Sequence, residues 1–174
     1  MNCLRSKSHL QKEMAQSSTS NSSDMDNSEQ YQIRLLREAD KVKYLALLSQ
    51  LTTVGEISDD QWKERFEELS RMNDTYEIWV LEEKSTSNLV ACATLLIEKK
   101  FIHGVSQVGH IEEVVTDSAY RGKGLGKKLI THLIDRAKIL KCYKVILDCK
   151  EDLIPFYASC GMKQHAVSAA VYFE

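Results

Sequence analysis

The chain has 174 residues, of which 43% are hydrophobic and one is proline, and its formal net charge at pH 7 is −2. This length and apolar content fit one globular domain with a core of its own. A slightly negative chain has no long-range attraction for nucleic acid, so we expect no nucleic-acid partner, and any phosphate recognition must come from local basic groups.

The first 29 residues are expected to form a disordered extension, and residues 30–174 the folded domain. Residues 15–30 consist mainly of Ser, Asn, Asp and Gln, so they cannot bury enough surface to offset the entropy of ordering. The chain starts without the apolar segment of a signal peptide and has no stretch of roughly 18 apolar residues that could span a membrane. We therefore expect no membrane span, a cytoplasmic protein, and buried, reduced thiols at its cysteines.

Hydrophobic periodicity predicts a strand and two helices in the first part of the domain. Residues 31–36 alternate in polarity like an edge strand, and residues 37–50 place apolar side chains at helical spacing. A second helix is expected to begin at Asp59, after which an apolar side chain recurs every three to four residues.

The rest of the chain predicts three strands, a helix, a strand, a short helix and a last strand. These expected elements cover residues 75–82, 89–97, 108–116, 125–140, 143–148, 152–159 and 169–173, in that order. The first two of these strands are joined by a polar turn and form a hairpin. Periodicity alone thus predicts a mixed α/β domain without an internal repeat.

Residues 121–126, with the sequence Arg-Gly-Lys-Gly-Leu-Gly, stand between the third long strand and the next helix. Their glycines let a ligand approach the main chain closely, and a helix N-terminus offers unpaired N–H donors, so this loop is expected to bind phosphate. A dinucleotide-binding loop would need a glycine where Lys127 or Leu129 stands. A Walker loop would need glycine in place of Arg121 and Ser or Thr in place of Lys128, so both patterns are excluded.

The remaining pattern, Arg/Gln-x-x-Gly-x-Gly/Ala, resembles the pyrophosphate-binding segment of the GNAT acetyltransferase superfamily. Within that superfamily the chain is most similar to the glucosamine-6-phosphate N-acetyltransferase family. The segments that carry this resemblance, besides the glycine loop, are residues 51–55, 97–103, 109–113, 142–149 and 156–157. The resemblance covers residues 32–173 and implies the GNAT fold, an α/β fold of α+β type with a mixed central sheet flanked by helices.

The activity that the resemblance implies is transfer of the acetyl group of acetyl-CoA to the amine of glucosamine 6-phosphate. This reaction would proceed by direct attack in a ternary complex and supply N-acetylglucosamine 6-phosphate for the synthesis of UDP-N-acetylglucosamine. A neutral amine is already a strong nucleophile, so the protein mainly positions two ligands and stabilises charge. The resemblance also implies a homodimer, acetyl-CoA as co-substrate, and no metal.

By the same resemblance, the coenzyme would bind along the end of the third long strand, where it diverges from the next strand, and on the glycine loop. The expected coenzyme-binding residues are Val114, Val115, Thr116, Arg121, Gly122, Lys123, Gly124, Leu125, Gly126, Lys127 and Tyr157. Tyr157 is also the expected catalytic residue that protonates or stabilises the leaving thiolate, because a phenol and a thiol have ordinary pKa values of about 10 and about 8.5. The alternative is a structural tyrosine that closes the short helix over the core.

The second expected catalytic residue is Asp148, which would hold the substrate amine; as an alternative, it would cap the next helix. Glu112 and Glu113 are adjacent on a strand, so their side chains should point to opposite faces unless a bulge intervenes. The expected substrate-binding residues are Thr52, Lys100, Phe101, Ile102, His103, Glu112, Glu113, Val114, Tyr143, Lys144 and Asp148.

Two positions depart from the family pattern. Glu113 stands where the family usually has aspartate, and Tyr172 stands about where a basic residue of the last strand reaches the phosphate in the partner subunit. A missing cation at a phosphate costs about 1.5 to 3 kcal/mol of charged hydrogen bonding. Two alternatives therefore stay open: a GNAT acetyltransferase of another amine, such as a polyamine, a free amino sugar or a protein N-terminus, and a catalytically weak acetyl-CoA-binding paralogue.

Overall fold

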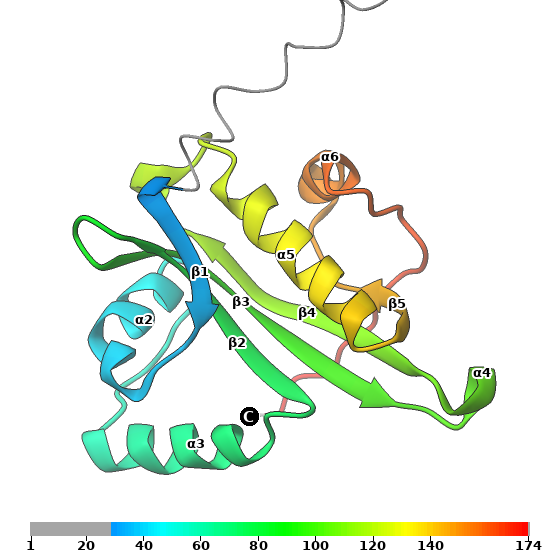
Figure 1. Ribbon diagram of the computed structural model, residues 1–174, viewed down its shortest axis with the longest axis horizontal. Helices are drawn as coiled ribbons and strands as arrows, with labels where there is room; N and C mark the ends of the chain where they lie inside the picture. Colours follow the sequence, from blue (N-terminus) through cyan, green and yellow to red (C-terminus); the bar gives the residue numbers. More distant parts are fainter. Residues whose placement is uncertain (1–28, 174) are drawn as a thin grey trace, which may run out of the picture.

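A mixed five-stranded sheet forms the centre of the protein in the computed structural model, which describes residues 29–173 (Figure 1). The expected disordered extension therefore lies almost entirely outside the described residues. The strands follow the order β1-β2-β3-β4-β5, with antiparallel pairing from β1 to β4 and parallel pairing between β4 and β5. The predicted fold class, a mixed sheet flanked by helices, is confirmed.

Most elements lie where periodicity places them. The strands are β1 (Tyr31–Leu35), β2 (Tyr76–Glu83), β3 (Asn88–Lys99), β4 (Gln107–Thr116) and β5 (Cys142–Ile146). The α-helices are α2 (Lys41–Leu48), α3 (Asp59–Arg71), α4 (Ile102–Val105), α5 (Leu125–Ile139) and α6 (Ile154–Ser159), and the 3-10 helices are η1 (Glu38–Asp40), η2 (Ser118–Tyr120) and η3 (Glu151–Leu153). No helix among these described residues is long and apolar enough to cross a membrane.

The two faces of the sheet have separate cores (Figure 1). On one face, α5 buries an apolar stripe that includes Leu129 and Leu133, because these side chains recur every four residues on the same side of the helix. On the other face, α2 buries Tyr44 and Leu47 against the sheet. Helices thus cover both faces of the sheet, and the ends of its strands stay accessible to ligands.

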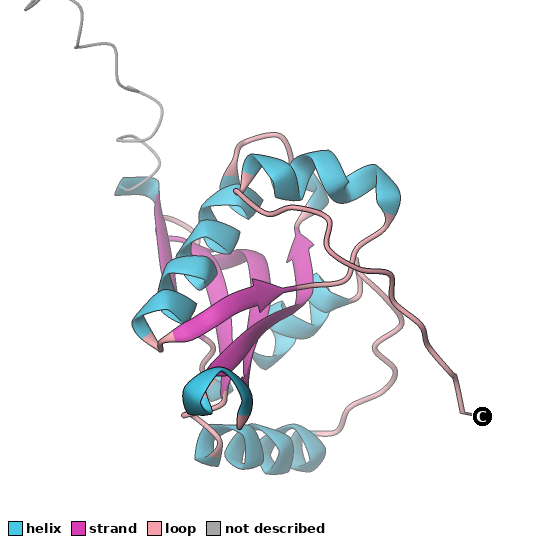
Figure 2. Ribbon diagram, turned by 90° about the vertical axis from the view of Figure 1, so that its right-hand side faces the viewer, coloured by secondary structure: helices cyan, strands magenta, loops and turns pink. Residues whose placement is uncertain are grey.

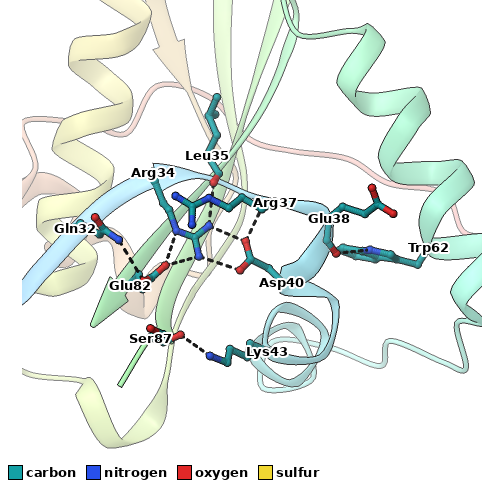
Figure 3. Close-up of polar contacts among 10 residues, drawn as sticks. All are labelled: Gln32, Arg34, Leu35, Arg37, Glu38, Asp40, Lys43, Trp62, Glu82 and Ser87. Atoms are coloured by element: carbon teal, nitrogen blue, oxygen red, sulfur yellow. Dashed lines mark hydrogen bonds and ion pairs between the residues drawn. The ribbon is translucent and has the colours of Figure 1, made fainter. Parts of the chain in front are cut away.

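A buried ion network holds the start of α2 against β1 and β2 (Figure 3). The guanidinium of Arg34 donates to both carboxylate oxygens of Asp40, at 2.7 and 2.9 Å, and also binds the carboxylate of Glu82. The Trp62 indole adds a bond of 2.9 Å to the carbonyl of Glu38, which ties α3 to the same region. A partly buried cation that pairs with two buried carboxylates fixes the geometry of the segment that carries it.

The expected strand at residues 169–173 is not formed. After α6 the chain follows an extended path without a strand partner and leaves the body of the molecule (Figure 2). Tyr172 and Phe173 are 92% and 89% exposed. The prediction is wrong for the single chain because an extended segment becomes a strand only when a neighbouring strand takes up its hydrogen bonds.

Two smaller differences lie near the expected site. The connection from β3 to β4 contains α4, in which His103 and Val105 have left-handed φ values of 53° and 61°, an uncommon conformation for residues with a Cβ atom. The four described cysteines are free, but the expected burial applies to Cys92 and is wrong for Cys149, which is exposed.

Candidate active site

A cleft of about 900 Å³ opens where β4 and β5 separate. Pairing of these strands starts at Gln107 with Cys142 and stops at His110 with Ile146, although β4 continues to Thr116. On its other edge, β4 remains paired with β3 as far as Thr116. Beyond His110, the edge of β4 on the β5 side therefore keeps its main-chain groups available for a ligand, and the strand divergence expected from the family resemblance is present.

A β-bulge interrupts β4 inside the cleft. Thr94 of β3 pairs with Glu112 and Cys92 pairs with Val115, so the single β3 residue between them faces two residues of β4. Glu113 lies at the bulge and has a left-handed φ of 51°. The sequence left open whether Glu112 and Glu113 face the same side; with this bulge, both line the cleft.

The glycine loop delivers the N-terminus of α5 to the same cleft. Gly124 is the N-cap in the left-handed conformation, with a φ of 75°, and it has no side chain to cap the helix. The N–H groups of the first turn consequently have no side-chain cap. At Gly126, a Cβ atom would lie 3.0 Å from Oγ1 of Thr116 and 3.4 Å from the ring of Phe156. Gly124 thus leaves the main chain at the helix start open to an anion, whereas Gly126 allows the start of α5 to pack closely against Thr116 and Phe156.

Basic side chains surround this helix start. Arg121 and Lys127 line the cleft, and Nε of Arg121 donates to the carbonyl of Thr116 at 3.1 Å, which orients the guanidinium along the end of β4. Lys123 is different: its Nζ lies 4.5 Å from the ring centre of Tyr120 and the residue does not line the cleft. All expected coenzyme-binding residues except Lys123 therefore meet in one place.

Tyr157 enters the cleft from α6. Pro155 occupies the first turn of that helix, where its missing N–H costs little. Tyr157 is 8% exposed, packs edge-on against Phe156, and has no hydrogen-bond partner for its hydroxyl in the described part of the chain. Burial raises the pKa of Tyr157 to about 12, with smaller contributions from Cys149 and Cys160. At neutral pH the phenol thus keeps its proton and can donate it.

Three acidic residues, Glu112, Glu113 and Asp148, also line the cleft. Desolvation raises the pKa of Glu112; His110 opposes the shift, and the charges of Asp148 and Glu113 add to it. Asp148 accepts a hydrogen bond of 3.2 Å from the hydroxyl of Ser168, and Glu113 accepts one of 3.1 Å from Thr94. These acids suit a cationic or protonated amine, and Glu112 is the one whose pKa favours uptake of a proton.

A second group of expected acceptor residues lies at the start of β4 instead. Lys100 and His103 line a separate cavity of about 390 Å³, together with Lys99 and Lys141. This cavity borders Gln107, five residues before Glu112, which corresponds to about 17 Å along an extended strand. One chain therefore does not bring the two groups into one pocket.

The remaining expected acceptor residues line neither cavity. Tyr143 stacks on His103 with ring centres 4.3 Å apart, and Nζ of Lys144 lies 5.6 Å from the centre of the Tyr143 ring. Phe101 and Ile102 are 95% and 58% exposed on α4. Thr52 is exposed in the segment after α2, next to the part of that segment that does line the cleft.

Several cleft residues are not identified by the sequence analysis. They are Gln50, Leu51, Ile111, Tyr120, Cys149, Lys150, Asp152, Leu153, Phe156 and Ser159. Phe156 stands in a motif that carries the family resemblance, so a signal existed for it. Leu51 also stands in such a motif, whereas Gln50 comes from a distant part of the chain and no local pattern in the sequence points to it.

The chain is similar to known proteins over most of its length. The model of the "Acetyltransferase (GNAT) family" matches residues 41–162. Glucosamine 6-phosphate N-acetyltransferase of Arabidopsis thaliana is 42% identical over 84% of this chain and 99% of its own length, and glucosamine 6-phosphate N-acetyltransferase 1 of Oryza sativa is 39% identical over 83% and 88%.

Solved structures agree with this relationship. The crystal structure of the Arabidopsis enzyme superposes with a TM-score of 0.80 over 83% of this chain and 99% of that one, at 42% identity. An acetyltransferase of Trypanosoma brucei superposes with a TM-score of 0.76 over 82% and 99%, at 36% identity. The chain therefore belongs to the GNAT acetyltransferase family and, within it, is a homologue of the glucosamine 6-phosphate N-acetyltransferases.

Proposed function

We propose that this chain transfers the acetyl group of acetyl-CoA to the amine of glucosamine 6-phosphate by direct attack in a ternary complex. The observation that carries the proposal is the cleft between β4 and β5. It combines an uncapped helix N-terminus, an open strand edge, a protonated phenol and a wall of carboxylates. The names of the homologues supply the acceptor.

The diphosphate of the coenzyme would bind the loop from Gly122 to Lys127. All residues of this loop except Lys123 line the cleft, and Arg121 adds a positive charge close by. A helix N-terminus stabilises an anion by about 0.3 to 1 kcal/mol on its own, so the loop amides and the guanidinium must contribute the rest. The pantetheine arm would pair with the open edge of β4 from Val114 to Thr116.

Starting from the ammonium form, nitrogen loses two protons, one before the attack and one as the amide forms, and the products are the amide, the free thiol of CoA and one proton released to solvent. Asp148 and Glu112 attract the ammonium form of the acceptor, and Glu112, with its raised pKa, is suited to take its proton. The neutral amine then attacks the thioester carbonyl, the C–N bond forms, and the C–S bond breaks. Tyr157 would donate a hydrogen bond to the departing sulfur and stabilise its negative charge, because burial raises the pKa of the phenol and keeps it protonated at neutral pH.

A second copy of the chain would complete the acceptor site. Lys100, His103 and the exposed ring of Phe101 lie at the open end of β4, and the extended tail carries exposed Val171 and Phe173. An apolar extended segment without a strand partner is suited to pair with another chain. We propose a cytoplasmic homodimer in which this pairing brings the phosphate-binding residues to the cleft. The product of the reaction would be used for UDP-N-acetylglucosamine synthesis.

The test is steady-state acetyl transfer to glucosamine 6-phosphate, unphosphorylated glucosamine and spermidine, measured side by side. We expect kcat/KM for the phosphorylated sugar to exceed that for the plain sugar by at least about tenfold, the value of one charged hydrogen bond. Equal values for both sugars, or a preference for spermidine, would contradict the proposed acceptor. Binding of CoA without turnover would establish the catalytically weak paralogue instead.

A further inference from the structure

The side chain of Gln50, just after α2, reaches across to the segment that leads into the glycine loop. Its amide nitrogen donates to Oδ2 of Asp117 at 2.9 Å, and its amide oxygen accepts from the main-chain N–H of Ser118 at 2.9 Å. The partners are 67 and 68 residues away in the sequence. One side chain thus makes two bonds to consecutive residues, and one of them involves a charged acceptor.

The segment that Gln50 holds is already organised by its own bonds. Asp117 donates its main-chain N–H to the carbonyl of Val90 at 2.9 Å, and its Oδ1 accepts from the N–H of Ala119 at 2.8 Å, so it caps η2. Gln50 donates to the second carboxylate oxygen of Asp117 and accepts from the N–H of Ser118 at the start of η2. Any rotation of η2 that moves the following glycine loop must therefore break at least one bond to Gln50.

The position of Gln50 is itself determined by α2. This helix is anchored at its start by the ion network of Arg34 and Asp40 (Figure 3) and along its buried face by Tyr44 and Leu47. Gln50 and Leu51 both line the cleft. The side chain of Gln50 consequently joins the wall built from α2 to the loop that starts α5.

We propose that Gln50 is a positioning residue that clamps the β4–α5 loop in the conformation that receives the coenzyme diphosphate. Gln50 would act through Asp117 and Ser118 and not by contact with the reacting atoms. The amides of residues 122–127 would be held in place before the coenzyme arrives, which lowers the ordering cost of binding. This inference rests on the proposed binding of CoA in the cleft.

The hydrogen bond between Gln50 and Asp117 can be reversed by exchanging the amide and the carboxylate between the two positions. In Gln50→Glu, the new carboxylate still accepts from Ser118 but repels the carboxylate of Asp117. In the double variant Gln50→Glu/Asp117→Asn, the new amide at position 117 donates to the new carboxylate and still accepts from Ala119. The bond between positions 50 and 117 is restored with donor and acceptor exchanged, and the bond from the N–H of Ser118 is kept, so a purely steric or charge effect of either single change is separated from the loss of the clamp.

The experiment measures the Kd of CoA by isothermal titration calorimetry for the wild type, both single variants, the double variant and Ser49→Ala. The last variant is the matched control, because the Ser49 hydroxyl bonds only to the carbonyl of Ala46 within α2. We expect Gln50→Glu to raise the Kd about tenfold, equivalent to about 1.4 kcal/mol, with the double variant within about threefold of the wild type. Ser49→Ala should leave the Kd unchanged.

Steady-state kinetics with acetyl-CoA provide a second readout. A clamp on the coenzyme loop predicts a higher KM for acetyl-CoA in Gln50→Glu at nearly unchanged kcat, whereas general damage to the fold would lower kcat and the melting temperature together. Unchanged Kd in Gln50→Glu, or no recovery in the double variant, would overturn the inference while CoA binding by the wild type stands. Absence of CoA binding by the wild type would instead overturn the proposed function.

Discussion

The two ends of β4 differ in how completely one chain builds them. At the Thr116 end, the strand edge, the glycine loop, α5 and α6 enclose one cleft, and Leu125 and Tyr157 are buried beside it. At the Gln107 end, α4 leaves Phe101 95% exposed and the cavity beside it is much smaller. The Thr116 end, where we propose that the coenzyme binds, is thus enclosed within one chain, and the Gln107 end, which carries proposed acceptor residues, is an open surface.

The coenzyme half and the acceptor half of the proposed reaction therefore depend on different kinds of contact. The coenzyme half comes mostly from neighbouring elements of one fold, so its geometry is set when the sheet and α5 pack. The acceptor half includes an exposed tail and an exposed turn, whose side chains gain little unless another surface covers them. Substitutions at the two ends should therefore change different measured quantities.

The largest effect is expected at the coenzyme end, for Tyr157→Phe. Loss of the phenolic hydrogen bond to the departing sulfur should lower kcat about 100- to 1000-fold, the typical effect of removing one donor to a charge that develops in the transition state, while the Kd of CoA changes little. The matched control is Tyr31→Phe, which removes the hydroxyl of another buried tyrosine in the core, away from the cleft. Full activity of Tyr157→Phe would assign Tyr157 to packing alone.

The next effect belongs to the open end. The double change Val171→Asp/Phe173→Asp places charge on two exposed apolar side chains of the tail. If the tail is buried in a dimer, loss of about 3 kcal/mol of apolar burial should weaken dimerisation about 100-fold. Analytical ultracentrifugation measures this change, with Gln164→Asp as a control on the polar part of the tail.

The tail variant also tests whether the two ends of β4 act independently. The Kd of CoA should be the same in the tail variant as in the wild type, since the coenzyme end is complete in one chain. A wild type that sediments as a monomer at all concentrations would remove the proposed partner, and a tail variant that loses CoA binding would show that the two ends are not independent.

A smaller effect is expected for Gly126→Val. Its side chain would press on Thr116 and Phe156, which a Cβ atom alone already approaches to 3.0 and 3.4 Å. Overpacking of this kind costs about 1 to 3 kcal/mol, so the Kd of CoA should rise about tenfold or more. Thr131→Val, on the exposed side of the same helix, is the control and should bind CoA normally.

The smallest effect is expected for pH, because kcat should stay nearly constant at alkaline pH. Burial holds the pKa of Tyr157 at about 12, above the ordinary value, so the proton of the phenol is present at neutral pH and is lost only as the pH rises through that raised value. With saturating substrates, kcat should not fall between about pH 8 and about pH 10. A decrease with an apparent pKa near 10 that disappears in Tyr157→Phe would show that the phenol is not shielded in the working enzyme.

The coenzyme end could be predicted well from sequence because its signals are local. The spacing of Arg121 and the glycines indicates the loop, and the apolar repeat of α5 places the helix start directly after it. The β-bulge at Glu113 could not be read, because a bulge depends on how β4 pairs with β3, which no pattern within β4 records. Gln50 was missed for a related reason: its partners lie in a distant segment.

The open end was predicted less accurately. The alternation of residues 169–173 indicates an extended segment, and the chain is extended there, but the strand is absent because no neighbour within this chain pairs with it. The left-handed backbone at His103 and Val105 similarly depends on the tight path between β3 and β4 and not on the preferences of these residues.

The most direct test of the account compares the affinity of the wild-type chain for CoA and for pantetheine, which lacks the diphosphate and the 3′-phosphoadenosine attached to it. If the loop before α5 holds that diphosphate, calorimetry should show clear binding of CoA and binding of pantetheine that is at least about 100-fold weaker, a difference of about 2.7 kcal/mol. Equal affinities for the two ligands, or no measurable binding of CoA, would contradict the account.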